Sequence, residues 1–177
     1  MKETNPLYGK RIFLAPLRKE DEGRLFGWTN DPSLAYHSSY FRPVDWRSHI
    51  NWLERTSKDQ SRVVFTIRMV KTDELIGMVQ LKDIHSVNRS AELTIQIPGE
   101  RNRGKGYGTE AVILLIKYAW RDLNLRRVEL KVLTSNVTAI KTYEAAGLQI
   151  EGTLRSCIYV NGEWNDMHLM GVIRDID

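Results

Sequence analysis

The sequence predicts a mixed α/β fold, built around one sheet whose strands are mostly antiparallel. Three observations predict it. Three strand-like runs follow one another through short turns in residues 62–97, as in an antiparallel meander. A glycine-rich loop and a long apolar run then separate the third strand from a fourth at 127–133, which predicts a parallel crossover. Finally, Asn161-Gly162 lies between two long strand-like runs and predicts a closing hairpin.

The first third of the chain predicts one strand and two helices. Residues 11–17 are apolar enough for a first strand, and residues 18–28 place a few apolar side chains among charges, as a surface helix does. Asn30-Asp31-Pro32 ends that helix, because proline disfavours helical geometry in the residue before it. A polar and aromatic stretch, 33–43, precedes a second helix at 45–56.

The remaining elements complete the sheet. Strands of the meander are expected at 62–70, 75–84 and 90–97. Residues 109–120 are apolar on nearly every side, so this helix is expected to be buried against the sheet. A helix at 137–146 has Asn136 placed to cap its start and Gly147 placed as a left-handed C-cap. The final hairpin is expected to join strands at 148–160 and 164–172.

Composition bounds the class of protein. The 177 residues are 42% hydrophobic and 27% charged, which fits one domain, 1–177, with a sizeable core. The lone Cys157 cannot form an internal disulfide, and the four histidines lack zinc-ligand spacing. We therefore expect a cytoplasmic protein that binds no metal.

Charge and hydropathy limit the kinds of partner that we expect for this chain. The net charge of +4 permits an anionic ligand without requiring one. Basic residues are spread among acids rather than gathered in a stripe, which argues against a nucleic-acid partner. The longest apolar run, 111–116, is far shorter than the ~20 residues that cross a bilayer, so no membrane partner is expected.

The most informative segment is the loop 103–108, Arg-Gly-Lys-Gly-Tyr-Gly, between a strand-like run and the apolar helix. Its three glycines let the main chain bend tightly and approach a ligand closely. The first turn of the following helix points unpaired N–H groups and its positive dipole end at the same loop. This arrangement predicts a site for an anion, and for a pyrophosphate in particular.

Two common phosphate loops do not fit this segment. The dinucleotide fingerprint needs its third glycine one place later, and an acidic residue at the end of the second strand. Here that strand ends in Leu133-Thr134-Ser135-Asn136. The nucleotide-triphosphate P-loop needs Ser or Thr after its lysine, but Lys105 is followed by Gly106. A nicotinamide cofactor and ATP hydrolysis are therefore not expected.

Two segments carry a family resemblance. Arg103, Gly106 and Gly108 match Arg/Gln-x-x-Gly-x-Gly/Ala, the signature of the GNAT superfamily of acyl-CoA-dependent N-acetyltransferases. Downstream, residues 136–148 resemble the family's Asn-x-x-Ala-x-x-x-Tyr-x-x-x-Gly-Phe segment, with Leu148 in place of the usual Phe. The similarity covers residues 10–173 and looks most like the branch of ribosomal-protein N-terminal acetyltransferases and spermidine acetyltransferases.

The resemblance implies acetyl-CoA as cosubstrate and a sheet of seven strands, with helices on both faces. It also implies a parallel strand pair that splays apart at the cofactor site, where main chain meets pantetheine and the glycine loop binds the pyrophosphate. The residues assigned to the cofactor in this way are Thr94, Ile95, Gln96, Arg101, Arg103, Gly104, Lys105, Gly106, Tyr107, Gly108, Thr109, Asn136 and Lys141. For the arginines and for Lys105, ordinary surface solvation is an equal alternative.

Two side chains are candidates for proton transfer. The resemblance makes Tyr143 the general acid, because a phenol of pKa ~10 is protonated at neutral pH and can protonate a thiolate whose conjugate acid has a pKa of ~8.5. The alternative is a core tyrosine packed beneath Gly147. Glu92 is the only acid on the strand at 90–97. It could act as a base through water, or form an ordinary hydrogen bond or ion pair.

The acceptor is expected to be a primary amine, and branch resemblance places the α-amine of a protein or peptide first. Deprotonating an α-amine at neutral pH costs only about 1 to 1.4 kcal/mol, against about 4.6 kcal/mol for a lysine-like amine. Polyamine, aminoglycoside and amino-sugar acceptors stay open, as does a non-catalytic acyl-CoA-binding module. The branch is also compatible with a homodimer. Acceptor choice is expected to reside in residues 28–52 and in the hairpin 157–166. The aromatics of the first region, Trp28, Tyr36, Tyr40 and Phe41, could equally belong to the core or to the acceptor pocket.

Overall fold

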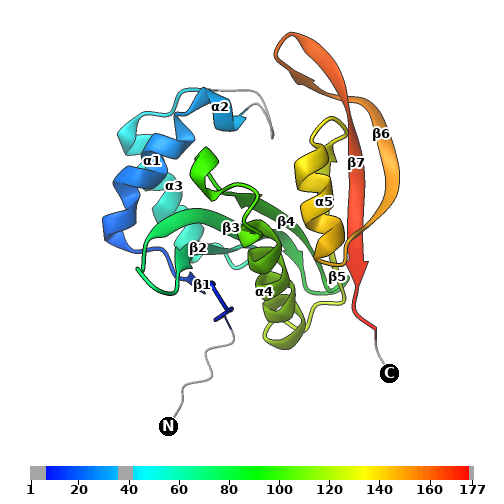
Figure 1. Ribbon diagram of the computed structural model, residues 1–177, viewed down its shortest axis with the longest axis horizontal. Helices are drawn as coiled ribbons and strands as arrows, with labels where there is room; N and C mark the ends of the chain where they lie inside the picture. The colour runs from blue at the N-terminus through cyan, green and yellow to red at the C-terminus, as the bar shows by residue number, and fades with distance from the viewer. Residues whose placement is uncertain (1–6, 36–41, 176–177) are drawn as a thin grey trace.

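The computed structural model describes residues 7–35 and 42–175 and confirms the mixed α/β fold. Seven strands form one sheet in the order β1-β2-β3-β4-β5-β7-β6 (Figure 1). The strands are β1 (Ile12–Ala15), β2 (Val63–Met69), β3 (Leu75–His85), β4 (Ser90–Gln96), β5 (Arg127–Leu133), β6 (Gln149–Val160) and β7 (Glu163–Ile173). The helices are α1 (Glu22–Thr29), α2 (Pro32–Ala35), α3 (Trp46–Lys58), α4 (Tyr107–Arg121) and α5 (Val137–Ala145), with short 3-10 turns η1 (Lys19–Asp21) and η2 (Glu100–Asn102).

Neighbouring strands pair antiparallel except β4 and β5, which run parallel in the middle of the sheet. That parallel pairing is short, because only residues 90–92 of β4 meet residues 127–129 of β5. Both strands continue beyond this point without pairing with each other. The sheet is therefore split at its centre, as the family resemblance implied.

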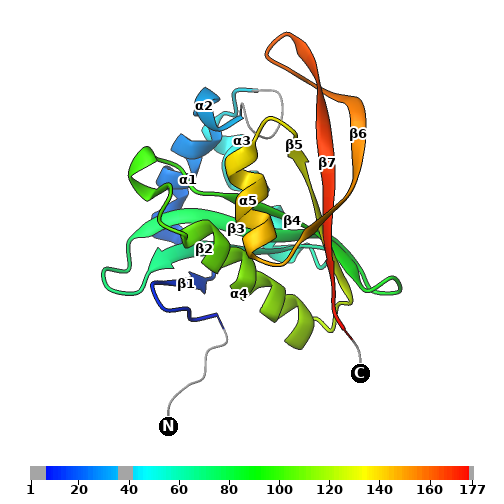
Figure 2. The same cartoon turned by 45° about the vertical axis from the view of Figure 1, so that its right-hand side comes forward.

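Helices cover both faces of the sheet. Helices α4 and α5 lie on one face, and α1 and α3 lie on the other (Figures 1 and 2). The main core lies beneath α4, whose Ala111, Val112, Leu115 and Ala119 are fully buried. Because α4 is apolar nearly all round, packing against the central strands fixes the position of its N-terminal end.

The predicted elements are confirmed to within a few residues, and the local signals explain why. The side chain of Asn136 accepts a hydrogen bond from the Ala139 N–H at 3.2 Å and so caps α5. At its other end, Gly147 has a φ of 98°, as a left-handed C-cap requires. The short α2 and η2 were not predicted. Three of the aromatic acceptor candidates, Tyr36, Tyr40 and Phe41, lie outside the described residues.

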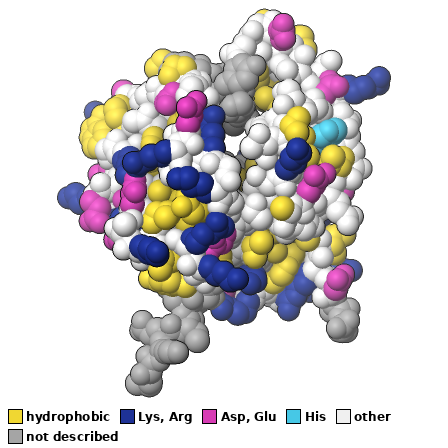
Figure 3. Space-filling model, viewed as in Figure 1, with side chains coloured by type: hydrophobic (Ala, Val, Ile, Leu, Met, Phe, Trp, Pro, Cys, Tyr) yellow, Lys and Arg dark blue, Asp and Glu magenta, His cyan; other side chains and the backbone are white. Residues whose placement is uncertain are grey.

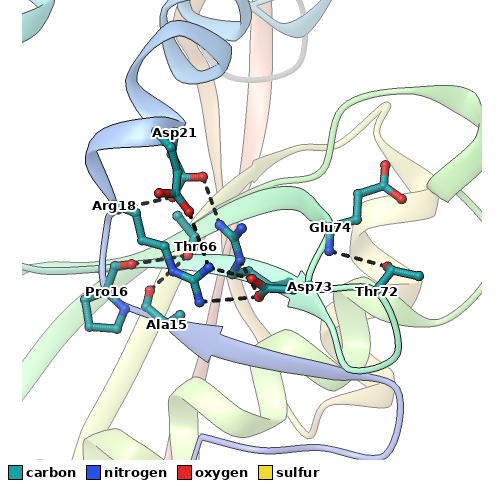
Figure 4. A network of polar contacts seen from close by, with 10 residues as sticks. Ala15, Pro16, Arg18, Asp21, Thr66, Thr72, Asp73 and Glu74 are labelled. Carbon is teal, nitrogen blue, oxygen red and sulfur yellow. Dashed lines mark hydrogen bonds and ion pairs between the residues drawn. The ribbon is translucent and has the colours of Figure 1, made fainter.

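A network of ion pairs joins the start of α1 to the turn between β2 and β3 (Figure 4). At its centre, Arg68 of β2 donates to Asp21 and to Asp73, each at 2.8 Å. The Arg68 and Asp21 side chains are only 7% and 4% exposed. Arg18 makes a second ion pair with Asp73 at the outer side. Buried charges of this kind need their partners, so the network holds α1 against the sheet.

Within residues 7–35 and 42–175, no helix combines the length and the apolar character that crossing a bilayer requires. In the same residues, no group of His, Cys, Asp and Glu side chains is arranged to hold a metal ion.

Candidate active site

The glycine loop presents a row of main-chain donors at the start of α4. Gly106 is the helix N-cap and, like Gly104, has a positive φ (74° and 69°), which glycine adopts without strain. Within the described part of the chain, the N–H groups of residues 104–109 have no acceptor. The first helical bond is donated by Glu110 to the Gly106 carbonyl, at 3.1 Å. These N–H groups are therefore available to an anion at the positive end of α4.

The third glycine of the loop serves packing. A Cβ built on Gly108 would lie 3.2 Å from Cγ2 of Thr142 and 3.8 Å from Cδ1 of Ile97. Thr142 belongs to α5 and Ile97 follows β4. Glycine at this position thus lets α4 approach α5 closely, whereas the distance to Ile97 is an ordinary van der Waals contact.

The predicted pantetheine-binding strand leads directly into this loop. Thr94, Ile95 and Gln96 lie in the part of β4 that has separated from β5. Their main chain pairs with β3 on one side and has no strand on the other. Such an open strand edge can pair with the amides of an extended ligand. The Thr94 hydroxyl accepts a hydrogen bond from Gln80 at 2.7 Å, which fixes its side chain.

Tyr143 lies near the end of α5 and belongs to the hydrophobic core, with 9% of its surface exposed. Burial raises the pKa of its phenol to about 12. Among the described residues, the phenol has no hydrogen-bond partner. The structure thus shows the core tyrosine that the sequence left as an alternative, and the role of general acid stays a prediction. Asn136, seven residues earlier, is confirmed as a helix cap, and its assignment to the cofactor stays a prediction.

Glu92 lies at the last paired position before the sheet divides, opposite Glu129 of β5. Its carboxylate forms an ion pair with Lys82 of β3 at 2.8 Å, and its side chain is 23% exposed. This is the ordinary strand ion pair that the sequence left as an alternative. A role as general base would require the carboxylate to act while paired with Lys82, or to leave it.

The predicted basic residues differ in what they contact. Arg101 forms an ion pair with Glu74, which also lies 3.6 Å from Arg24 of α1. By contrast, the exposed side chains of Arg103, Lys105 and Lys141 form no ion pair with any described residue. The space-filling view shows Lys and Arg side chains beside a hollow on this face of the molecule (Figure 3). The three unpaired cations are therefore free to meet phosphate groups.

A groove lies next to the donor loop and was not located from the sequence. It has a volume of about 620 Å³ and runs between α2, η2 and the turn of the β6–β7 hairpin. Its lining includes the carboxylates of Asp31 and Glu100, together with Arg103 and Asn161. The groove thus brings together the two regions in which acceptor choice was expected to reside.

Two further residues missed by the sequence analysis contact the loop. Arg11, immediately before β1, and Glu110, in the first turn of α4, form an ion pair at 2.9 Å. The pair joins residues 99 positions apart, and neither belongs to a motif that would have revealed it.

Comparison with known proteins gives close relatives. The chain is 30% identical over 171 residues to the uncharacterized N-acetyltransferase p20 of Bacillus licheniformis, covering 95% of this chain and 96% of p20. It is 30% identical over 158 residues to spermidine N(1)-acetyltransferase of Escherichia coli K12, covering 88% and 82% of the two chains. The crystal structure of Vibrio cholerae spermidine N-acetyltransferase with CoA and spermine superposes with a TM-score of 0.84 at 24% identity, over 92% of this chain and 95% of that one.

The family itself follows from the matched domain. The acetyltransferase (GNAT) domain model matches residues 11–149, a span that includes the donor loop, the divided strands and Tyr143. The fold, the order of the motifs and the relatives agree with this match. The chain is an N-acetyltransferase and belongs to the GNAT acetyltransferase family.

Proposed function

We propose that this N-acetyltransferase uses acetyl-CoA and transfers the acetyl group to a polyamine of the spermidine type. The observation that carries the cofactor assignment is the row of unpaired N–H groups at residues 104–109, beside the free edge of β4. A pyrophosphate on the loop would leave the pantetheine arm directed along that edge, toward the split in the sheet. The CoA in the Vibrio cholerae structure supports this assignment.

The proposed reaction needs no metal and one proton donor on the enzyme. The neutral amine attacks the thioester carbon and forms a C–N bond, while the carbonyl electrons move to oxygen. The tetrahedral intermediate then collapses, the C–S bond breaks, and the sulfur takes a proton. In this scheme Tyr143 supplies that proton, and main-chain N–H groups at the end of β4 are candidates to stabilise the oxyanion. The amine loses its own proton to water or to a base.

Charge in the groove favours a polyamine. Asp31 and Glu100 both line it, so among the described residues its lining carries two carboxylates against the single cation of Arg103. Each protonated amine of a polyamine chain could pair with a carboxylate, while one neutral amine reaches the thioester. The relationship to the Escherichia coli spermidine enzyme supports the same choice. This order differs from the sequence analysis, which placed a peptide α-amine first.

The peptide α-amine stays a second candidate because of Glu92. Its carboxylate is already paired with Lys82 at 2.8 Å, so it is a poor candidate for taking a proton. An α-amine needs little help, since its deprotonation costs only about 1 to 1.4 kcal/mol at neutral pH. Deprotonating a lysine-like amine of a polyamine would cost about 4.6 kcal/mol at neutral pH. A polyamine would therefore need a base, or would react through the small fraction of its amines that is already neutral.

A panel of acceptors would decide between a polyamine and a peptide α-amine. Thiol release from acetyl-CoA would be measured with spermidine, with a peptide bearing a free α-amine, with the same peptide acetylated at its N-terminus, and with an aminoglycoside. We expect kcat/KM for spermidine to exceed that for the peptide by at least tenfold. A larger value for the free peptide, lost on acetylation, would establish the second candidate. No release with any amine, despite CoA binding, would favour a non-catalytic acyl-CoA-binding module.

Neutralising the groove should raise KM for the polyamine. Asp31→Asn and Glu100→Gln are each expected to raise KM for spermidine roughly threefold and to leave kcat unchanged, because an exposed ion pair contributes up to about 1 kcal/mol. Asn can still accept the Ser33 hydrogen bonds that Asp31 accepts. The effect should shrink in high salt. Glu144→Gln removes an exposed acid from α5 outside the groove and is the matched control. Equal KM values in all three variants would contradict the placement of the acceptor.

A further inference from the structure

The guanidinium of Arg11 contacts the donor loop from the side of β1. Its Nε donates to Oε2 of Glu110 at 2.9 Å, Nη1 donates to the Lys105 carbonyl, and Nη2 donates to the Gly106 carbonyl at 3.3 Å. The Arg11 main-chain N–H donates to the other Glu110 oxygen, also at 2.9 Å. The guanidinium lies over the Tyr107 ring, 5.3 Å from its centroid. One side chain, from the residue just before β1, is therefore bound to two loop carbonyls and to the first turn of α4.

The planarity of the peptide bond gives these contacts a consequence for the ligand site. In a trans peptide the carbonyl and the following N–H point in opposite directions. Because Arg11 holds the carbonyls of Lys105 and Gly106, it orients the N–H groups of Gly106 and Tyr107 away from itself. Those two N–H groups belong to the unpaired row at the start of α4. Arg11 thus contributes to the direction in which they point, together with the helical bond that Glu110 donates to the Gly106 carbonyl.

The surroundings of the pair are shaped to keep it in place. A Cβ built on Gly9 would lie 2.3 Å from Oε1 of Glu110, so only glycine leaves room for the carboxylate there. A Cβ on Gly106 would lie 3.0 Å from Nη2 of Arg11. Burial alone would raise the pKa of Glu110, but the hydrogen bonds from Arg11 outweigh it and hold that pKa below its usual value. Glu110 is therefore charged at neutral pH and anchors the guanidinium.

A direct contact between Arg11 and a phosphate is the competing explanation, and the geometry disfavours it. Three of the five guanidinium N–H groups, one on each nitrogen, already donate to loop carbonyls or to Glu110. The carboxylate of Glu110 also offsets the positive charge that a phosphate would meet. The exposed cations Arg103 and Lys105, which form no ion pair within the described residues, are better placed for that contact.

We infer that Arg11, anchored by Glu110, is a positioning residue that orients the loop N–H groups toward the pyrophosphate of acetyl-CoA. This inference rests on the proposed function, which assigns the pyrophosphate to the loop. It predicts an effect on one part of the cofactor only, because the pantetheine arm would lie along β4 in the proposed function and would not depend on these peptide planes.

The test compares two ligands on the purified full chain. Binding of CoA and of pantetheine, which has the same thiol arm and lacks the pyrophosphate, would be measured by calorimetry for each variant. In Arg11→Lys, the single ammonium group cannot contact Glu110 and both loop carbonyls at the same time. We expect Kd for CoA to rise about tenfold and Kd for pantetheine to stay within about twofold. KM for acetyl-CoA should rise with the CoA Kd, and kcat at saturation should stay within about twofold.

Two further variants separate positioning from stability. Glu110→Gln keeps an acceptor for the Arg11 N–H and removes the anchoring charge, so a rise of about threefold in the CoA Kd is expected. Arg89→Lys is the matched control, because Arg89 donates to the Asn124 carbonyl and side chain at the opposite end of α4. It should leave both dissociation constants unchanged even where its unfolding temperature falls as far as that of Arg11→Lys.

The outcomes distinguish failure of the proposed function from failure of the positioning role of Arg11. If the unmodified chain binds CoA no better than pantetheine, the loop does not bind the pyrophosphate and the proposed function fails. If it prefers CoA, and Arg11→Lys keeps that preference or weakens both ligands equally, the positioning role is overturned while the proposed function stands. A selective loss of CoA affinity in Arg11→Lys, absent in Arg89→Lys, supports the inference.

Discussion

Replacing Tyr143 by Phe is expected to lower kcat about 10²-fold and to leave the affinity for CoA within about threefold. The change removes the phenol oxygen alone, and the ring of this buried residue keeps its place in the core. Without the phenol, the departing thiolate must take its proton from water. The measurement is thiol release at saturating acetyl-CoA and amine, with CoA binding followed separately by calorimetry.

The raised pKa of Tyr143 bears on how the proton moves. A phenol of pKa about 12 is a weaker acid than a free thiol of pKa ~8.5, by about 3.5 units or ~4.8 kcal/mol. The same burial that disfavours the phenolate also disfavours a thiolate beside it. The difference between the pKa of the phenol and the pKa of the thiol is therefore smaller within the site. In the proposed mechanism, Tyr143 is then a hydrogen-bond donor that completes proton transfer as the C–S bond breaks.

The pH dependence follows with a definite sign. In the proposed mechanism the protonated phenol is the active form, so the contribution of Tyr143 to activity is lost as pH rises through its pKa. Because burial raises that pKa to about 12, no descending limb from Tyr143 is expected between pH 6 and 10. A descending limb near pH 10 that vanishes in Tyr143→Phe would show that the phenol titrates at its ordinary value and would contradict the burial argument.

Tyr118 supplies the control for Tyr143→Phe. It lies on α4, packs edge-on against Phe65 with ring centroids 5.1 Å apart, and burial raises its pKa too. Tyr118→Phe should leave kcat within about twofold, because its phenol is not part of the proposed site. If the two variants lose the same activity, or if Tyr143→Phe leaves turnover unchanged, Tyr143 has no role as a proton donor.

Local signals explain why so much of the fold could be predicted from the sequence. The cap at Asn136 and the turn at Asn161-Gly162 each depend on residues within four positions of one another, and the turn residues have the positive φ values of 53° and 85° that its type requires. The glycine loop belongs to the same class. Its N–H donors come from consecutive residues, so their number and spacing can be predicted from the sequence.

Register explains what could not be predicted, and Glu92 is the clearest case. Counting along the hairpin from the pair His85 and Ser90 would place Asp83 opposite Glu92, two like charges. In the structure a register shift between Lys82 and His85 brings Lys82 opposite instead, and Asp83 takes a positive φ of 52°. One inserted residue thus gives Glu92 the ion pair that the sequence left as an alternative, and its role as a base stays a prediction. Periodicity alone carries no signal for such a bulge.

Contacts between distant segments are the other gap. Arg101 pairs with Glu74, 27 positions away, a contact that the sequence did not reveal, and its assignment to the phosphates stays a prediction. The Arg11–Glu110 pair and the groove lined by Asp31 and Asn161 likewise join segments that only the sheet order brings together. Each depends on strand order and side-chain direction, which residue types do not specify on their own.

Removing Asp21 is expected to have the largest effect on stability. Asp21→Ala should lower the free energy of unfolding by about 3 kcal/mol, because it leaves the Arg68 guanidinium buried with one partner in place of two. The Asp21 carboxylate also accepts the Arg18 N–H at 3.1 Å, and this hydrogen bond is lost as well. Urea unfolding followed by tryptophan fluorescence gives the measurement.

Two further variants test whether burial of the Asp21–Arg68 pair causes the loss of stability in Asp21→Ala. Glu20→Ala removes the exposed partner of Arg18 from the same turn, a contact of 3.5 Å, and should change stability by no more than about 0.5 kcal/mol. The double variant Asp21→Leu with Arg68→Met removes both central charges and should recover most of the loss, to within about 1 kcal/mol of the unmodified chain. An Asp21→Ala cost no larger than that of Glu20→Ala would mean that the buried pair stabilises no more than a surface one.

The same variant connects the fold to the site. Asp21 precedes α1, and the chain leaving α1 carries Asp31 to the rim of the groove. The donor loop, by contrast, is held by α4 and Arg11 on the other side of the sheet. In the fraction of Asp21→Ala that stays folded, KM for the amine should therefore rise while Kd for CoA stays unchanged. A parallel loss of both would indicate that the two faces of the sheet unfold together, and that α1 is not an independent support for the acceptor.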